Sequence, residues 1–575
     1  MTFSLIRTVA VTLALAGASV PLAAQQLHLT VTQPGGFPGL PVMTGMAKVT
    51  NGVQLTWDGP SGYYQVFQKS NSLAAAWVAL GKATNLTRTA TITTLYSNAF
   101  FRVSSAAPKY AGVKVCISCH NSICRYETNT AHASAFINPH FAALGGQTNA
   151  SCLACHTVGY GLPTGFVSAT ATPLLAGVQC ENCHGPAANH AASPDDPTVV
   201  PRVEIAATVC GGCHTDSHTT YTTAPTYEEW SASGHAAVVP DVLQSMASST
   251  NNISSCGRCH SGSARLALLD GLNPAVTLAK DYNVPLTCAV CHDPHRQSVW
   301  TNVLSGIITF TNTLTGNATV ITNTALGKVY TNQLRYALAS MNDFVMTTSD
   351  VFSNKYDATI NVCAQCHNDR GAAWTDTSRS PHHSPQYNML LGTVGELAAG
   401  PTPGLPATHS RLEMQCVECH MQTTTNTSGH TFAVATYQVC FQCHSDPAGL
   451  VKFVTNSIAG QIQQTKSYLD YWATQIVPTT IPGLQKYGTF AWEYTTPGDL
   501  SPGGSGPGKN DQALIPDDIK KARFDLYLVL YDGSYGVHNG PYDVELLQAA
   551  NNWVFGQIIT TMTQQVYDQS LLYLP

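Results

Sequence analysis

The stretch GVQCENCHGPAANH occupies residues 177–190 and combines two closely spaced cysteines with two histidines. Cys180 and Cys183 are separated by two residues, which matches the spacing of the two haem vinyl groups that form thioethers with cysteine. His184 follows directly and is placed to bind the iron from one side, as in the c-type attachment signature. His190, six residues further on, is a candidate ligand for the opposite side of a haem.

The same Cys-x-x-Cys-His pattern occurs nine times and uses 18 of the 19 cysteines. Zinc is the competing interpretation, since paired C-x-x-C units are common zinc ligands. Histidine makes up only 21 of 575 residues, yet it follows the second cysteine in nine cases of nine. We therefore expect nine covalently bound c-type haems. Numbered in chain order, the motifs are Cys116, Cys119 and His120 (motif 1); Cys152, Cys155 and His156 (2); Cys180, Cys183 and His184 (3); Cys210, Cys213 and His214 (4); Cys256, Cys259 and His260 (5); Cys288, Cys291 and His292 (6); Cys363, Cys366 and His367 (7); Cys416, Cys419 and His420 (8); and Cys440, Cys443 and His444 (9).

The first 24 residues have the features of a secretory signal peptide: one basic residue, Arg7, an apolar run, and small residues before Gln25. No second apolar run of about 18 residues occurs, so we expect no membrane span in the mature chain. Only 10% of residues are charged and the net charge is −6, which argues against nucleic acid or an anionic membrane as partner. We expect an exported protein, either periplasmic or at the cell surface.

Residues 27–107 lack the motif and contain short alternating or aromatic-rich runs separated by Gly, Pro, Asn and Ser, such as Val53–Trp57 and Tyr63–Phe67. This pattern predicts a small antiparallel β-sandwich. The stretch resembles a fibronectin type III domain, with Trp57 and Tyr64 as the expected core aromatics. A spacer or docking role is the expected one, and no residue marks a carbohydrate site.

Residues 110–295 carry six motifs, with steps of 36, 28, 30, 46 and 32 residues between their first cysteines. Segments this short cannot build a separate apolar core around each site, so the haems must form the core and lie close together. Close haems exchange electrons. Several stretches within 110–240 resemble the tetrahaem cytochrome c554 family: Tyr110–Gly112, Thr130–Ala133, Cys155–Gly159, Val178–Pro186 and Trp230–His235. That resemblance implies distal haem ligation by His132, His190 and His235.

Residues 296–362 form the longest interval without a motif inside the haem region, and their Thr, Asn, Val and Ile content predicts one or two β-hairpins. Residues 363–575 hold the last three motifs and three long helices, expected at about 450–476, 516–531 and 541–569. Acidic residues follow Pro516 and Pro541, as is typical of helix first turns. The predicted fold class is therefore multidomain, with a small all-β sandwich before a mostly α, loop-rich multihaem region.

The C-terminal part has a second resemblance. Cys419-His420-Met421, His430 and the stretch Tyr535–Tyr542 are similar to the cytochrome c nitrite reductase and hydroxylamine oxidoreductase superfamily. The resemblance implies that His538 is a distal ligand. The catalytic haem of such nitrite reductases is held by a motif that ends in Lys, and none of the nine motifs ends so.

Counting histidines leaves twelve outside the motifs. His28 lies beside the signal peptide, and His218 is only four residues after His214. One of the adjacent pair His382 and His383 is expected to point away from the haems. The remaining candidates for distal ligation of nine irons are His132, His140, His190, His235, His295, one of His382 and His383, His409, His430 and His538.

Nine bis-histidine irons have no open position for substrate and predict an electron conductor. Three alternatives stay open: Met ligation at one or two haems, an oxidoreductase of nitrite, hydroxylamine or a sulfur oxyanion at one five-coordinate haem, and a subunit of an extracellular cytochrome filament. His140 is the least supported ligand, and the cytochrome c554 resemblance implies that one haem can be five-coordinate. The expected partners are redox proteins or extracellular electron acceptors. Cys124, the nineteenth cysteine, is expected to be a packed thiol.

Overall fold

The computed structural model describes residues 42–49, 52–58, 64–70, 78–83, 89–92, 99–105, 109–127, 130–162, 164–192, 194–195, 201, 205–215, 225–270, 272–274, 282–295, 298–301, 307–311, 318–322, 329–332, 362–397, 400–401, 407–412, 414–424 and 427–571. The expected signal peptide, His28 and His218 lie outside these residues. The chain divides into two compact units, one formed by residues 1–231 with 287–297 and the other by 232–286 with 298–575. Each is described by itself.

The first unit begins with six strands in two antiparallel three-stranded sheets, with orders β1-β2-β5 and β4-β3-β6. Leu55 and Trp57 of β2 and Phe101 of β6 are buried, in keeping with the alternation of apolar residues along these strands. The fibronectin resemblance remains a prediction. The strands are β1 (Val42–Val49), β2 (Gly52–Asp58), β3 (Tyr64–Ser70), β4 (Val78–Ala83), β5 (Thr89–Ile92) and β6 (Ala99–Ser105).

Short helices and loops follow in the first unit. Five of its helices contain or end in motif residues, and Phe136, Leu153, Val158, Phe166 and Leu175 make a small apolar cluster between them. The helices are α1 (Val113–Glu127), α2 (Pro139–Ala143), α3 (Ala150–His156), η1 (Pro173–Leu175), α4 (Cys180–His184), α5 (Ala188–Ala192), α6 (Thr208–Gly211), α7 (Thr226–Ser231) and α13 (Cys288–Cys291).

The second unit contains short helices around motifs 5, 7, 8 and 9, and two separate antiparallel strand pairs, β7 with β10 and β8 with β9. These pairs lie in the interval where the sequence predicts hairpins. The elements before the long helices are η4 (Gly234–Ala236), α8 (Pro240–Ser248), α9 (Thr250–Ser255), α10 (Gly257–His260), α11 (Gly262–Leu269), β7 (Ser298–Thr301), β8 (Ile307–Thr311), β9 (Ala318–Thr322), β10 (Val329–Asn332), α15 (Gln386–Leu391), β11 (Glu396–Leu397), β12 (Gly400–Pro401), η6 (Thr408–Arg411), α16 (Cys416–His420) and η7 (Gln438–Gln442).

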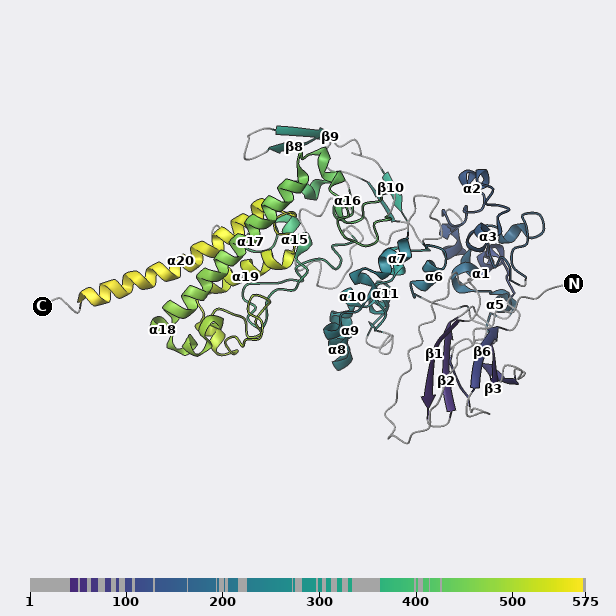
Figure 1. Cartoon of the computed structure of the whole chain (residues 1–575), viewed down its shortest axis with the longest axis horizontal. Helices are drawn as coiled ribbons and strands as arrows, with labels where there is room; N and C mark the ends of the chain where they lie inside the picture. The colour runs from purple at the N-terminus through teal and green to yellow at the C-terminus, as the bar shows by residue number, and fades with distance from the viewer. Residues whose placement is uncertain are drawn as a thin grey trace. The chain divides into compact units, whose positions relative to one another are not determined.

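The three long helices expected near the C-terminus are present, and Figure 1 shows them lying alongside one another. The first begins after Asp446, whose carboxylate accepts the backbone N–H of Gly449, and its last turn widens into a π-helix just before Pro478, a residue without an N–H. The elements are α17 (Pro447–Tyr471), the π-helix η8 (Trp472–Ile476), α18 (Val477–Thr480), η9 (Pro482–Phe490), η10 (Asp511–Leu514), α19 (Asp517–Asp532) and α20 (Gly540–Leu571).

An apolar core joins these helices and includes Leu469, Trp472, Trp492, Tyr527 and Leu546, each at most 1% exposed. Burial of a large apolar side chain contributes about 1.5–3 kcal/mol, so this core stabilises the second unit independently of any cofactor.

A polar cluster is buried within this core. Arg523 Nη1 donates to the carbonyls of Trp492 and Glu493 at 2.9 and 2.8 Å, and the Tyr527 hydroxyl donates to Glu493 Oε1 at 2.6 Å. Arg523 Nη2 also donates to Oε1 of Gln512 at 3.0 Å, so both terminal nitrogens of the buried guanidinium are hydrogen-bonded.

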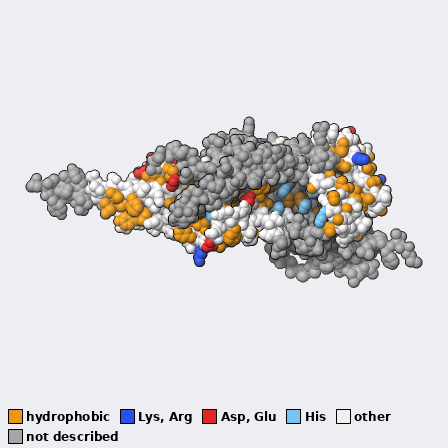
Figure 2. Space-filling model, turned by 90° about the horizontal axis from the view of Figure 1, so that it is seen from above, with side chains coloured by type: hydrophobic (Ala, Val, Ile, Leu, Met, Phe, Trp, Pro, Cys, Tyr) orange, Lys and Arg blue, Asp and Glu red, His pale blue; other side chains and the backbone are white. Residues whose placement is uncertain are grey.

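Charged side chains are sparse on the face drawn in Figure 2, where histidines gather among hydrophobic side chains. This agrees with the 10% charged composition. In the described part of the chain, no helix is both long and apolar enough to cross a membrane.

Candidate functional site

Several of the motifs lie in short helices. In α4 and α16 the helix spans the whole motif, from Cys180 to His184 and from Cys416 to His420. Residues three and four apart lie on the same helix face, so the second cysteine and the histidine stand beside the first cysteine. All 19 cysteines lie in the described part of the chain, and no disulfide joins any of them. The motif thiols are therefore available for thioether formation.

Motif 3 is anchored by a buried carboxylate that sequence reasoning did not identify. Glu181, 3% exposed, accepts the backbone N–H groups of Ala111, Gly112 and Ala187 at 2.7 to 3.0 Å. Burial raises the pKa of Glu181, and these three hydrogen bonds oppose that rise. The residue before Cys180 acts similarly, because Gln179 Oε1 accepts the backbone N–H of Val113 at 2.7 Å. The quoted stretch thereby fixes motif 3 against the segment that leads into motif 1.

Seven of the nine motif histidines face a second histidine from a distant part of the same unit, with ring centroids 5.9 to 6.4 Å apart. Each pair joins one motif histidine to one of the residues expected to be a distal ligand. In the first unit the pairs are His120 with His190 (6.4 Å), His214 with His132 (6.0 Å) and His184 with His295 (5.9 Å). In the second unit they are His367 with His235 (6.2 Å), His260 with His382 (6.0 Å), His444 with His409 (6.2 Å) and His420 with His538 (6.2 Å).

These separations match what one metal ion between two imidazoles requires. An imidazole nitrogen binds a first-row metal at about 2.0 Å and the ring centroid lies about 1.1 Å behind it, so two axial rings have centroids about 6.2 Å apart. The seven observed values lie within 0.3 Å of this separation. The donor set and its spacing therefore fit a haem iron held from both sides.

The remaining candidates have other surroundings. His383 stacks on the Tyr531 ring at 3.8 Å, whereas its neighbour His382 faces His260. His430 Nδ1 lies 3.2 Å from the hydroxyl of Ser428. His140 is on α2 with an exposed side chain.

The motif 2 histidine, His156, has its ring stacked on Phe141 at 4.1 Å. Its Nδ1 hydrogen-bonds the carbonyl of Ala135 at 3.2 Å.

Hydrogen bonds to backbone carbonyls orient other rings. Nδ1 of His420 lies 3.1 Å from the Phe432 carbonyl, and Nδ1 of His409 lies 2.9 Å from the Val537 carbonyl. A carbonyl accepts only, so Nδ1 carries the proton and Nε2 keeps the lone pair that a metal needs.

Burial favours the neutral form of four of the candidate distal imidazoles. It lowers the pKa of His235 to about 4, and together with the charge of Arg370 it lowers the pKa of His382 to about 3. The pKa values of His132 and His409 also fall on burial. A neutral imidazole is the form that binds a metal, so these surroundings favour ligation over protonation.

Cysteines of different motifs lie close together, which the sequence could not indicate. Cys155 and Cys213, of motifs 2 and 4, lie close enough for each to shift the pKa of the other, and so do Cys210 and Cys288, of motifs 4 and 6. In the second unit the same holds for Cys259 and Cys366, of motifs 5 and 7. Groups attached at these cysteines would therefore be close neighbours.

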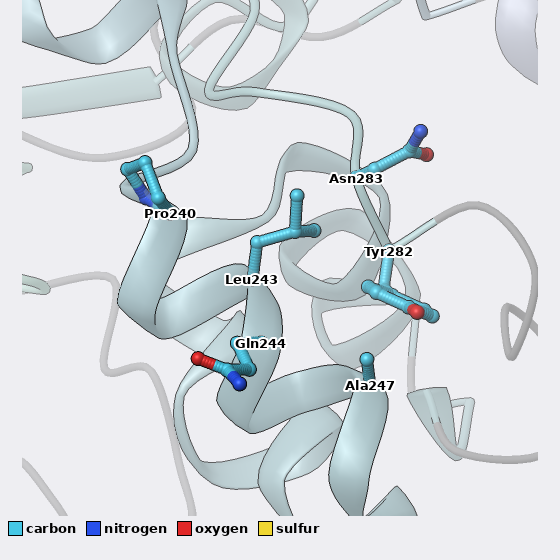
Figure 3. Close-up of a pocket in the computed structure, with 6 residues that line it drawn as sticks. All are labelled: Pro240, Leu243, Gln244, Ala247, Tyr282 and Asn283. Atoms are coloured by element: carbon cyan, nitrogen blue, oxygen red, sulfur yellow. The ribbon is translucent and has the colours of Figure 1, made fainter. Parts of the chain in front are cut away.

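One open pocket has no motif residue in its lining. Pro240, Leu243, Gln244 and Ala247 of α8 line it together with Tyr282 and Asn283 (Figure 3). Its lining includes no carboxylate, imidazole or thiol, so we assign it no role in the chemistry.

Residues 115–185 match the family model described as cytochrome c554 and c-prime. This segment contains motifs 1 to 3. Together with the repeated motif and the histidine pairs, the match supports a multihaem c-type cytochrome. A curated relative is cytochrome c-554 of Nitrosomonas europaea, 32% identical over 98 residues. The match covers 15% of this chain and 42% of that relative.

Two solved structures show limited similarity to the whole chain. One is the outer cell wall cytochrome OcwA, with 17% identity and a TM-score of 0.48 over 77% of this chain and 99% of that one. The other is an undecahaem cytochrome from the S-layer of Carboxydothermus ferrireducens, with 20% identity and a TM-score of 0.46 over 79% of this chain and 70% of that one.

Proposed function

We propose that the chain is an exported nine-haem c-type cytochrome that carries electrons along closely spaced bis-histidine haems. The observation that carries the proposal is the set of seven histidine pairs with centroid separations of 5.9 to 6.4 Å. Haem supplies reversible one-electron chemistry when it is bound. The cysteines of each motif attach it, the motif histidine binds one side, and the facing histidine binds the other.

Two axial imidazoles leave no iron position for a substrate and change little in geometry when an electron arrives. This favours conduction over catalysis. The closeness of Cys155 to Cys213 and of Cys259 to Cys366 supports short steps between neighbouring haems. His140 and His430 remain candidate distal ligands, which we assign to no particular motif. Export rests on residues 1–24, and redox proteins or extracellular acceptors are the partners we propose.

The test is a coulometric titration of the purified, haem-loaded full chain with a one-electron donor. Conduction predicts uptake of nine electrons per chain, rapid equilibration among the haems, and no turnover of nitrite or hydroxylamine. Fewer haems per chain, haems that stay out of equilibrium, or steady turnover of either substrate would overturn the proposal. The His538→Ala variant serves as a comparison. It removes the proposed distal ligand of one haem and leaves every motif cysteine, and so haem attachment, unchanged.

A further inference from the structure

Asp532 occupies an unusual position beside one of the histidine pairs. It is the last residue of α19, its side chain is fully buried, and its Oδ1 lies 2.7 Å from Nδ1 of His538. Gly533 follows in the left-handed conformation (φ 72°) and ends the helix, which turns the chain back so that His538 meets the helix end. His538 in turn faces the motif 8 histidine, His420, at 6.2 Å.

Ser534 completes a closed network around this contact. Its hydroxyl donates to Asp532 Oδ2 and also accepts the backbone N–H of His538 at 3.1 Å. The carboxylate therefore has one oxygen on Ser534 and the other on the imidazole. The ring is thus tightly bound to the carboxylate.

The other described ring contacts differ in charge. The Nδ1 atoms of His420 and His409 meet backbone carbonyls, and Nδ1 of His382 meets the hydroxyl of Ser384 at 3.0 Å. His190, which faces the motif 1 histidine, has a buried Nδ1 without a hydrogen-bond partner among the described residues. The candidate distal histidines therefore differ in what their Nδ1 atoms meet. Nδ1 of His190, at motif 1, has no hydrogen-bond partner among the described residues, whereas Nδ1 of His538, at motif 8, is bound to a carboxylate.

We propose that Asp532 is a positioning residue that lowers the reduction potential of the motif 8 haem. A carboxylate that accepts the Nδ1 proton makes the imidazole a stronger electron donor, which stabilises the ferric over the ferrous iron. The negative charge of Asp532, held against the ring, would act in the same direction. The inference rests on the proposed function, because it requires haem between His420 and His538.

The experiment is a spectroelectrochemical titration of the haem-loaded full chain with Asp532→Asn. Asparagine keeps the size and an acceptor oxygen but removes the charge. One of the nine steps is expected to shift so that the ferrous form gains at least about tenfold, which is about 59 mV for one electron. Asp532→Glu should return most of that shift.

Two further variants separate this role from simple support of the fold. Ser534→Ala removes a hydrogen bond that withdraws charge from Asp532, so the same step should move in the opposite, negative direction. Asp525→Asn changes another buried acid of α19, one that accepts the Glu396 backbone N–H at 2.9 Å, and should leave all nine steps in place. A role limited to support of the fold predicts the same direction of shift for every one of these variants.

The results distinguish the two proposals. If Asp532→Asn and Ser534→Ala leave every step unchanged while all haems stay low-spin, the assignment to Asp532 is wrong and the conductor survives. If the unmodified chain lacks haem at motif 8, or holds a high-spin haem there, the proposed function itself fails at that site. If Asp532→Asn loses its haem and Ser534→Ala does not, the Ser534→Ala shift decides. A negative shift supports the role of Asp532, and a positive shift or none overturns it.

Discussion

The adjacent histidines His382 and His383 allow a matched test of the ligand assignment. The ring of His382 lies 6.0 Å from that of His260. The ring of His383 is nearly perpendicular to the His382 ring (85°) and stacks on Tyr531. The two substitutions remove the same chemical group from neighbouring positions. We expect only His382→Ala to remove an iron ligand from the haem proposed at motif 5.

The expected size of the effect follows from the geometry. His382→Ala should convert one haem in nine from low-spin to high-spin and open it to cyanide, because His260 remains as a single axial ligand. His383 cannot replace it without leaving the Tyr531 ring, where the centroids are 3.8 Å apart. His383→Ala loses only that stacking contact, worth about 0.5–1.5 kcal/mol, and should leave the spin state of every haem unchanged.

Low-temperature EPR of the two oxidised variants, each with its haem content measured, is the assay. Integration should give a high-spin fraction of one-ninth for His382→Ala and none for His383→Ala, relative to the unsubstituted chain. Equal spectra for the two variants, or a high-spin signal from His383→Ala, would refute the assignment of His382 to motif 5.

Three predictions concern the protein scaffold and are read out by chemical denaturation of the haem-loaded chain. Glu181→Gln should destabilise the first unit by about 1.5–3 kcal/mol, because a charged acceptor of three backbone N–H groups becomes neutral; an unchanged midpoint would show that these bonds add nothing. Leu469→Ala, at a fully buried site, should cost about 2–5 kcal/mol in the second unit, while Leu450→Ala at an exposed site of α17 should cost little. Burial raises the pKa of Asp525 well above its ordinary value, so the folded state keeps this proton to higher pH and stability is lost as pH rises from the unfolded pKa towards the folded one. Asp525→Asn should therefore give a flatter stability profile above about pH 4, and a profile parallel to that of the unsubstituted chain would contradict this.

The sequence was sufficient for features that depend on local pattern. Each attachment motif occupies five consecutive residues, and the starts of α19 and α20 follow from proline positions and first-turn acids. Such signals act within a few residues, so no tertiary information is needed to find them.

The pairing of ligands could not be obtained in this way. His235 faces His367, and His420 faces His538, across more than a hundred intervening residues. Which rings meet depends on how the loops fold around the motifs. The number of histidines does not tell which candidate distal histidine faces which motif histidine. The same limit applies to Glu181, which is an ordinary x residue of its motif in the sequence yet accepts three backbone hydrogen bonds in the fold.

Asp532 shows a third kind of limit. Its position at the end of a predicted helix suggests an ordinary surface acid, and acids at helix C-termini are opposed by the helix dipole. Only the turn through Gly533 and Ser534 brings it to His538 and buries it. A local rule that fails in this way marks a functional position, because the unfavourable placement has to be offset by the contact it makes.

The central claim is that every iron in this chain is held by two histidines and conducts rather than catalyses. Quantitative low-temperature EPR of the oxidised, unsubstituted full chain, with iron and haem counted on the same sample, tests it most directly. The account predicts nine haems per chain, all low-spin, with spectra unaffected by nitrite, hydroxylamine or cyanide. One high-spin haem per chain that responds to these ligands would contradict the claim and identify a site where substrate can bind.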